Sequence, residues 1–500
     1  MFRPSSTRWR GCSAVAAACA LAARAPAQQP GNPPPPVPQP DAQKQLDQVL
    51  RENAEMKKAI QDLKQKVDGS PPPAAQPGTP PAQPGAQPSS QDALDRALAE
   101  SAPTPGRPSA TGDLASFKLG SATVKLIDVS FVADLAVGWS SENDASLQTL
   151  QGGGHDPRKR GFTLQAAELG ISGAVDPYFN AQANIAYFID PQSGESVVEL
   201  EEAFATTTSL PYGLQVKAGQ YLTEFGILNG THPHAWDWLD QPVIMSRLLS
   251  GDGMRAPGAR IGWLLPVPWY SQLIAGVQNG NGEQMVSFLA NEETFSDRGI
   301  GGRPFGDPQV SGFGDLVYSG RWENSVDLSK ETTIKFGVSE AVGPNGSGAG
   351  ENTRLYGADF KLKWKASSNE RGWPFVIWQS EIMARDYDAA AVPAAGLPET
   401  TLHDWGFYTQ ALYGFTPGWA AGIRYEYATG SGESVGGREN DPFRDNRQRI
   451  SPVLIWNLSE FSRLRLQYNH DIADHLASGH ADSLYFGLEV LFGAHPAHTY

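Results

Sequence analysis

The sequence predicts an all-β protein, a transmembrane antiparallel β-barrel of about 16 strands that follows a short coiled-coil helix and proline-rich linkers. Three observations favour this class. From residue 113 to residue 500, about 16 runs alternate apolar and polar side chains with a period of two. The polar positions carry full charges, and the apolar positions often end in aromatic residues, as in tilted strands that cross a bilayer. Tight turns alternate with long polar loops, which is typical of outer-membrane barrels.

The N-terminus has the features of a secretory signal peptide over residues 1–27. A basic region with three arginines precedes an apolar core of small residues at 12–23, and Ala-Pro-Ala at 25–27 fits a cleavage site. The two cysteines are Cys12 and Cys19. If cleavage follows residue 27, the exported protein contains no cysteine, which excludes disulfides, thiolate metal sites and a cysteine nucleophile.

Residues 28–40 form a proline-rich linker, residues 41–69 a predicted coiled coil, and residues 70–112 a second linker rich in Pro, Ala and Gln. The predicted helix has apolar residues at heptad spacing, with an asparagine at one a position that would set the register. We expect self-association, in a homotrimer, although a lone amphipathic helix on the protein's own surface stays an alternative. The heptad positions are Leu46, Val49, Asn53, Met56, Ile60, Leu63 and Val67.

The barrel prediction covers residues 113–500. Its best-defined piece is the pair of alternating runs 197–208 and 213–222, joined by a tight turn that contains Pro211. A soluble sandwich or a β-helix also alternates and remains the competing interpretation, but it does not usually need strands of 9–12 residues that end in aromatics. The other predicted strands are 128–139, 163–175, 181–189, 259–264, 269–278, 312–322, 333–339, 356–365, 375–386, 405–413, 422–427, 451–458, 463–469 and 483–492.

The charge balance limits the partners. The chain has a net charge of −15, which argues against nucleic acid as a partner. The barrel region contains 27 Lys+Arg and 45 Asp+Glu, and a lumen with that excess favours cations unless the acids lie on the outer loops. Lys361, Lys363 and Lys365 share the polar face of one run. They either form a basic stripe in the lumen, where they would contact solute, or neutralise the charge of nearby acidic side chains.

The connection at 231–247 carries the most distinctive side chains. Its prolines and clustered charges exclude a regular strand. His232 and His234, with Asp237 or Asp240, have the ligand chemistry of a divalent metal such as zinc. The alternative is a loop whose tryptophans pack on the barrel rim or wall while the histidines meet water or backbone. We expect Asp237, Asp240 and Arg247 to line or narrow the pore mouth and to contact solute.

Several segments resemble a known family. Glu199–Phe204, Leu214–Tyr221, Phe225–Asn229, His232–Asp237 and the ending Leu491–Tyr500 are similar to zinc-regulated TonB-dependent outer-membrane receptors. The strand pattern is more loosely similar to that of phosphate-selective O/P porins. The receptor resemblance implies a 22-stranded barrel with a globular plug, and the porin resemblance implies a markedly basic pore.

Taken together, these patterns predict a porin-like channel of the cell outer membrane, with the coiled coil in the periplasm, for passive diffusion of small polar solutes or ions. The expected partners are the lipid bilayer, lipopolysaccharide and peptidoglycan. Two alternatives stay open: a receptor or transporter that binds a metal or small ligand, and a structural tether between the outer membrane and the cell wall. No catalytic constellation stands out, so we expect no enzymatic activity and no cofactor apart from the zinc considered above.

Overall fold

The structure is a computed structural model that describes residues 116–119, 122–125, 127–294, 299–306 and 309–493 of the 500-residue chain. The chain divides into two units, 1–112 and 113–500, and the described residues all belong to the second. The predicted signal peptide, coiled coil and linkers lie outside the described residues, so those assignments stay predictions.

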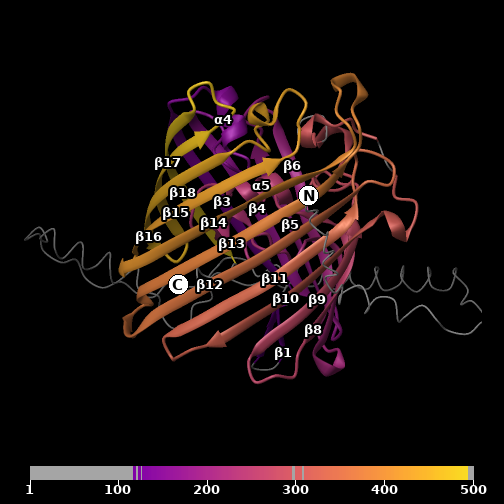
Figure 1. The fold of residues 1–500 in the computed structure, drawn as a ribbon. Coiled ribbons are helices and arrows are strands. Elements are labelled where there is room, and N and C mark those ends of the chain that lie inside the picture. Colours follow the sequence, from indigo (N-terminus) through magenta and orange to yellow (C-terminus); the bar gives the residue numbers. More distant parts are fainter. Residues whose placement is uncertain (1–115, 120–121, 126, 295–298, 307–308, 494–500) are drawn as a thin grey trace, which may run out of the picture. The chain divides into compact units, whose positions relative to one another are not determined.

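Sixteen strands form one closed antiparallel barrel in which every strand pairs with its neighbours in the sequence (Figure 1). The ring closes because β18 pairs with β3, where Leu488 lies opposite Leu135. The predicted barrel of about 16 strands is therefore confirmed. The strands are β3 (Ile127–Ser140), β4 (Gly161–Ala174), β5 (Phe179–Ile189), β6 (Ser196–Thr207), β7 (Leu214–Leu222), β8 (Arg255–Leu264), β9 (Tyr270–Asn279), β10 (Leu316–Asp327), β11 (Thr332–Pro344), β12 (Asn352–Glu370), β13 (Trp373–Ala389), β14 (Thr400–Thr416), β15 (Trp419–Ser431), β16 (Arg447–Ser459), β17 (Ser462–Ala473) and β18 (His480–Gly493).

The remaining elements are short. Helix α4 (Asp144–Leu150) connects β3 to β4, and α5 (Val243–Leu249) lies between β7 and β8. Within the part of the chain that the structure describes, no helix has the length and hydropathy to cross a membrane. A small hairpin of β1 (Ser116–Leu119) and β2 (Ala122–Lys125) precedes the barrel. The 3₁₀ turns are η2 (Pro211–Gly213), η3 (Pro233–Ala235), η4 (Ile300–Gly302), η5 (Phe313–Asp315), η6 (Pro393–Ala395) and η7 (Arg438–Asn440).

The two rims of the barrel differ, as the turn pattern predicted. One rim carries tight turns such as Arg371-Gly372, where both residues have positive φ, 51° and 96°, as a two-residue hairpin requires. The first barrel strand begins at Ile127 and the last one ends at Gly493, and both residues lie at this rim because an even number of strands returns the chain to its starting side. The long connections all lie at the other rim and span residues 141–160, 223–254, 280–315, 390–399 and 432–446.

Each strand turns its apolar face outward. On β17, Leu466 and Ile472 face outward and are 44% and 47% exposed, whereas Arg463 and Arg465 face the lumen and are 1% and 2% exposed. A soluble protein would bury the first pair and expose the second. This inversion is what a lipid-facing outer surface and a polar interior require.

Aromatic residues mark the edges of the apolar band. Trp139 and Trp405 are exposed near the long-loop rim, while Tyr413 and Trp456 are exposed near the short-turn rim. Trp419 stacks on Trp456, with ring centroids 5.1 Å apart. Two such belts fit the headgroup regions of a bilayer. Some strands exceed the 9–12 residues expected from the sequence, because they continue beyond the band; β12 has 19 residues and a register shift before its end.

Candidate functional site

Residues 223–254, which connect β7 to β8, fold into the barrel; we call them the inner segment. The Trp238 indole N–H donates to the carbonyl of Ser451 on β16 at 2.8 Å, and the Leu239 amide donates to Gln467 on β17 at 2.7 Å. In a ring of sixteen strands, β15 lies directly opposite β7, and β16 and β17 follow β15 around the ring. The inner segment therefore crosses the lumen from one wall to the other.

Trp238 holds the inner segment against the far wall of the barrel. It is 1% exposed and packs in an apolar cluster formed by inward-facing side chains of β13, β14, β15 and β16. A tryptophan buried in this way with its N–H bonded contributes both apolar area and a satisfied polar group. The alternative expectation that the tryptophans pack on the barrel wall describes Trp238. The wall residues of the cluster are Trp373, Phe375, Ile377, Leu412, Ala420, Val453 and Ile455.

Helix α5 continues the filling of the lumen. All seven of its residues are buried, and Ile244, Met245 and Leu248 belong to an apolar cluster with wall residues such as Tyr408. At its N-terminus, the Val243 amide donates to Glu426 on β15 at 2.6 Å. A carboxylate there satisfies one of the helix's unpaired N–H groups and suits the positive end of its dipole.

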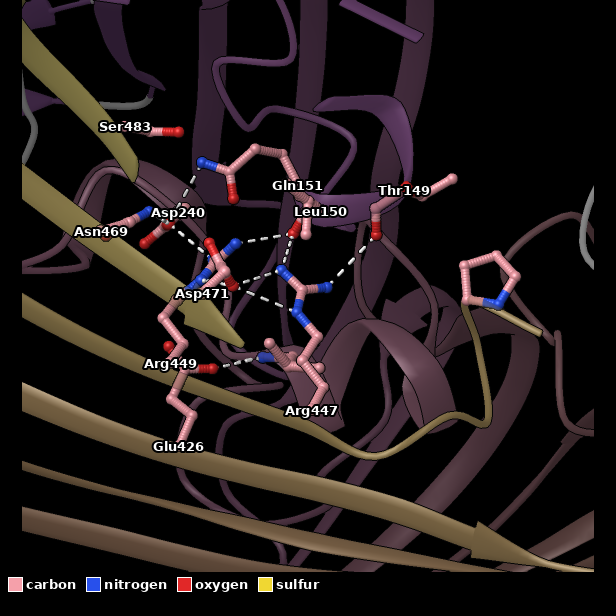
Figure 2. A network of polar contacts seen from close by, with 12 residues as sticks. Thr149, Leu150, Gln151, Asp240, Glu426, Arg447, Arg449, Asn469, Asp471 and Ser483 are labelled. Carbon is pink, nitrogen blue, oxygen red and sulfur yellow. Dashed lines mark hydrogen bonds and ion pairs between the residues drawn. The ribbon is translucent and has the colours of Figure 1, made fainter. Parts of the chain in front are cut away.

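Asp240 is the polar centre of the inner segment (Figure 2). Its two carboxylate oxygens accept bonds from Arg424 at 2.5 Å and Arg449 at 2.9 Å, and from two amide side chains, Gln467 at 2.7 Å and Asn469 at 2.6 Å. The donors come from three adjacent strands, β15, β16 and β17. A buried carboxylate is tolerated only when it is paired and hydrogen-bonded in this way.

The same network holds the first long loop, 141–160. Arg449 bridges Asp240 and Asp471, and its guanidinium also donates to the Leu150 carbonyl at 2.7 Å. Arg447 donates to the Thr149 carbonyl at 3.2 Å and bonds Asp471 at 2.9 Å (Figure 2). Two arginines on one strand therefore fasten the C-terminal end of α4 and the inner segment to the same wall.

The structure places the predicted contact residues in different environments. Arg247 is 5% exposed and pairs with Asp445 in the loop between β15 and β16, and its guanidinium donates to the Asp445 carbonyl at 2.8 Å. Asp240 is 1% exposed. Asp237 is half-buried, 4.0 Å from Arg463. Asp240 and Arg247 thus hold the inner segment in place, and of these three residues Asp237 is the most accessible from the lumen.

The two histidines meet carboxylates of the barrel wall. The Nδ1 atom of His232 lies 3.2 Å from Glu201 and 3.4 Å from Glu168, and its Nε2 atom lies 2.9 Å from Glu202. His234 Nδ1 lies 2.8 Å from the other Glu168 oxygen. Of the partners considered from the sequence, Asp240 accepts hydrogen bonds from Arg424 and Arg449, and Asp237 lies 4.0 Å from Arg463. The histidine site is therefore built between the inner segment, β4 and β6.

Two ionisable groups of the inner segment are perturbed in opposite directions by their partners. Burial alone would raise the pKa of Asp240, but Arg424 and Arg449 lower this pKa to about 2. Burial alone would lower the pKa of His232, but Glu168, Glu201 and Glu202 raise this pKa well above its usual value. Both groups are therefore stabilised in their charged forms, each by residues of the wall.

The three lysines of β12 face the lumen near the short-turn rim. Lys361 lies directly opposite Lys335 of β11, and Lys363 and Lys365 follow at alternate positions of the same strand. All four are half-buried, in contrast to the fully buried inward side chains of β16 and β17. Lys335 also pairs with Glu323 of β10 at 3.0 Å. The accessible part of the inner wall is therefore basic on this side.

One motif with catalytic associations has a structural role. Gly432-Glu-Ser434-Val-Gly436 matches Gly-x-Ser-x-Gly, but it lies in the loop between β15 and β16 rather than at a strand-to-helix turn. The Ser434 hydroxyl donates to Asp441 at 2.9 Å and accepts from Arg444 at 2.9 Å. Ser434 therefore lacks the exposed position that a nucleophile of this motif needs.

Sequence reasoning missed the wall residues that complete these sites. Glu168, Arg424 and Arg449 each occupy an ordinary polar position of an alternating strand, whereas Glu201 is the extra residue at a register shift in β6 that brings both Glu201 and Glu202 to His232. The period of two indicated that such residues face the lumen, but it gave no signal of which ones meet the inner segment.

No protein-family profile matches the chain. A protein of Aquifex aeolicus (strain VF5), described as an uncharacterized protein, is 29% identical over 401 residues, which cover 75% of this chain and 80% of that protein.

Several solved structures are similar in fold. The anion-selective porin from Comamonas acidovorans has 9% identity and a TM-score of 0.47, and covers 73% of this chain and 99% of its own. The outer-membrane channel DcaP of Acinetobacter baumannii has 11% identity and a TM-score of 0.46, with 73% and 97% covered. OmpF of Salmonella typhi, in complex with daunomycin, has 10% identity and a TM-score of 0.43, again with 73% and 97% covered.

Proposed function

We propose that this protein is a porin-like channel of the outer membrane that lets small polar solutes or ions diffuse through its lumen. The observation that carries the proposal is the inversion of the barrel surface, with exposed Leu466 and Ile472 outside and Arg463 and Arg465 inside. Such a barrel is stable only with lipid around it. A ring of 16 strands also encloses enough space for an aqueous path.

The solute path runs along the wall formed by β9 to β12. The inner segment packs on β13 to β17 and bonds carboxylates of β4 and β6, and near the long-loop rim its apolar cluster also includes Val317, Ala341 and Leu355 of β10, β11 and β12. Toward the short-turn rim, the lumen side chains of β11 and β12 are only half-buried. Lys335, Lys361, Lys363 and Lys365 place four ammonium groups on this wall. The proposal therefore includes a preference for small anions, although the net charge of the barrel sequence favours cations, because local charges decide selectivity.

Electrophysiology in planar bilayers tests both parts of the proposal. The purified full-length protein should give steady ion conductance, and a salt gradient should give a reversal potential of the sign expected for anions. Replacement of Lys361, Lys363 and Lys365 by Gln should move the reversal potential toward cation preference. The matched control Lys330→Gln, in an exposed turn, should leave it unchanged. A wild-type channel without conductance, or a reversal potential that does not respond to the triple change, would contradict the proposal.

A receptor or transporter is the second candidate, because the inner segment occupies so much of the lumen. The TonB-dependent receptors that the sequence resembles imply 22 strands and a separate plug, whereas this barrel has 16. The 32-residue inner segment (223–254) would have to act in place of a plug. The same bilayer experiment separates the two candidates, since a plugged receptor conducts almost no current.

The proposal for the assembly comes from the heptad pattern at residues 41–69, which lie outside the described residues. We propose a membrane-embedded homotrimer joined through this coiled coil in the periplasm, where it would also reach peptidoglycan. Deletion of residues 43–68 should leave single-barrel conductance intact and reduce the oligomer to monomers in native electrophoresis. A trimer that survives the deletion would place the contact on the barrel itself. Loss of wall attachment alone would favour the structural tether.

A further inference from the structure

The carboxylates Glu168 and Glu201 and the imidazole of His232 come together inside the barrel. One ligand atom from each of the three residues can be chosen so that all lie within 4.8 Å of one another. We propose that these three residues bind a divalent transition-metal cation of the Zn²⁺ class, and that this cation fastens the inner segment to β4 and β6. The inference does not depend on which solute the channel carries.

The distances fit direct coordination. His232 Nδ1 lies 3.2 Å from Glu201 Oε2 and 3.4 Å from Glu168 Oε1. Zinc bonds of about 2.0–2.1 Å at tetrahedral angles separate ligand atoms by about 3.3 Å. A cation between these three atoms therefore needs little movement of the side chains. Three protein ligands also leave room for solvent in the coordination sphere, as in known open zinc sites.

The charges around His232 favour a cation with more than one charge. Glu168, Glu201 and Glu202 all lie within 3.4 Å of its ring, and their side chains are 4–8% exposed. An imidazolium ring brings one positive charge and two N–H groups to these three carboxylates. Glu201 also lies 3.2 Å from His155, so the three carboxylates face three imidazoles, those of His155, His232 and His234, where water is largely excluded. With neutral imidazoles the three carboxylates carry a charge of −3, and a divalent cation would offset two of these charges.

The surrounding contacts have the form of an outer coordination shell. Glu202 lies 2.9 Å from His232 Nε2, on the side of the ring away from the proposed metal, and it also accepts from the Leu222 amide at 2.9 Å. Asn184 donates to Glu168 at 2.6 Å. A carboxylate on the far nitrogen of a metal-bound histidine fixes the tautomer and orients the ring.

The ligand set selects among metals. Calcium takes six to eight oxygen ligands, and magnesium keeps an octahedral shell of oxygens, so a buried imidazole is a poor partner for either. One nitrogen and two carboxylate oxygens suit zinc and its neighbours in the first transition row. The small hollow beside the site is lined by Glu201, His232 and Asp252.

Zinc binding to the full-length protein in detergent tests the inference, after removal of metals with a chelator. Calorimetry and metal analysis should find one Zn²⁺ per barrel, and neither Ca²⁺ nor Mg²⁺ should compete. His232→Gln or Glu168→Gln should weaken binding by more than about 100-fold, and the outer-shell change Glu202→Gln by about 10- to 100-fold. The control His403→Gln removes an exposed histidine that pairs with Asp386 on the outer surface, and it should change nothing.

A second measurement needs no variant and remains decisive if a substitution prevents folding. X-ray absorption at the zinc edge of the wild type should show nitrogen and oxygen ligands at about 2.0–2.1 Å, with the signature of imidazole. The proposal would be overturned if the wild-type protein bound no zinc, if His232→Gln bound zinc with the affinity of the wild type, or if the absorption spectrum lacked the imidazole signature. Such results would leave the channel function untouched, since conductance is measured separately.

Discussion

The Asp240→Asn substitution tests the central claim that buried ion pairs hold the inner segment across the lumen. The change keeps the size of the side chain but removes its charge and turns one acceptor into a donor. Arg424 and Arg449 would then face an amide instead of a carboxylate, at sites where they are 1% exposed. The free energy that keeps the inner segment docked should fall.

The size of the effect follows from the contacts that remain. Breaking a buried ion pair by removing one partner typically costs about 3–5 kcal/mol. Arg424 keeps Glu426 at 2.7 Å, and Arg449 keeps Asp471 at 2.8 Å, so neither guanidinium is left without a carboxylate. We therefore expect the lower end, about 3 kcal/mol. At 1.36 kcal/mol for each factor of ten, the undocked population rises roughly 150-fold.

Single-channel recording and limited proteolysis together measure this population. The Asp240→Asn barrel should show frequent excursions to higher conductance and faster cleavage within residues 223–254. The control Asp237→Asn makes the same chemical change in the same segment, at a half-buried carboxylate 4.0 Å from Arg463, and should shift the population by less than about threefold. If the folded Asp240→Asn protein records and digests like the wild type, the reasoning about the ion pairs is wrong.

Three further predictions follow from the same contacts. The pKa of Asp240 is lowered from 3.8 to about 2 in the folded state. Its carboxylate therefore stabilises the docked inner segment by about 2 kcal/mol above pH 4, and this stabilisation is lost as the pH falls through 2. High-conductance events should increase over that interval in the wild type but not in Asp240→Asn. Trp238→Ala should weaken docking of the inner segment by about 3–5 kcal/mol, because apolar burial is lost and a cavity remains. Faster proteolysis of the inner segment would report this loss, and the lipid-facing change Trp139→Ala should leave the proteolysis rate unchanged. Ile423→Lys places a charge on an outward position of β15 that is 54% exposed and should destabilise the barrel in vesicles by about 2–4 kcal/mol, measured by urea titration; an unchanged midpoint would argue that this face does not meet lipid.

The barrel was predictable because its signal is local. Alternation of apolar and polar side chains follows from strand geometry alone, so the faces of β3, β12 and β17 could be assigned without knowledge of their neighbours. Turn chemistry is equally local, which is why the tight turn that contains Pro211 and the long connection at 432–446 lie on opposite rims, as the alternation of short and long connections predicted. The lysines of β12 also lie on the predicted polar face.

The candidate sites were predictable only in part. His232 and His234 stood out as chemically unusual residues in a segment that is not a strand. Their partners did not, because Glu168 is 66 residues from His234 in the chain and lies on an unremarkable polar position of β4. The metal partners suggested by nearness in sequence lie beside arginines of the far wall instead: Asp240 accepts hydrogen bonds from them, and Asp237 is 4.0 Å from Arg463.

Local residue pattern thus determined that this chain makes strands, how many it makes, and which side of each strand meets lipid, since these depend on side chains at adjacent positions. Which charges pair inside was decided only when the ring closed and the inner segment folded across it. Asp240 and Arg449 are separated by 209 residues and come within 2.9 Å because the lumen is only as wide as sixteen strands allow. A contact of that kind depends on the curvature of the whole sheet, and no short stretch of sequence contains it.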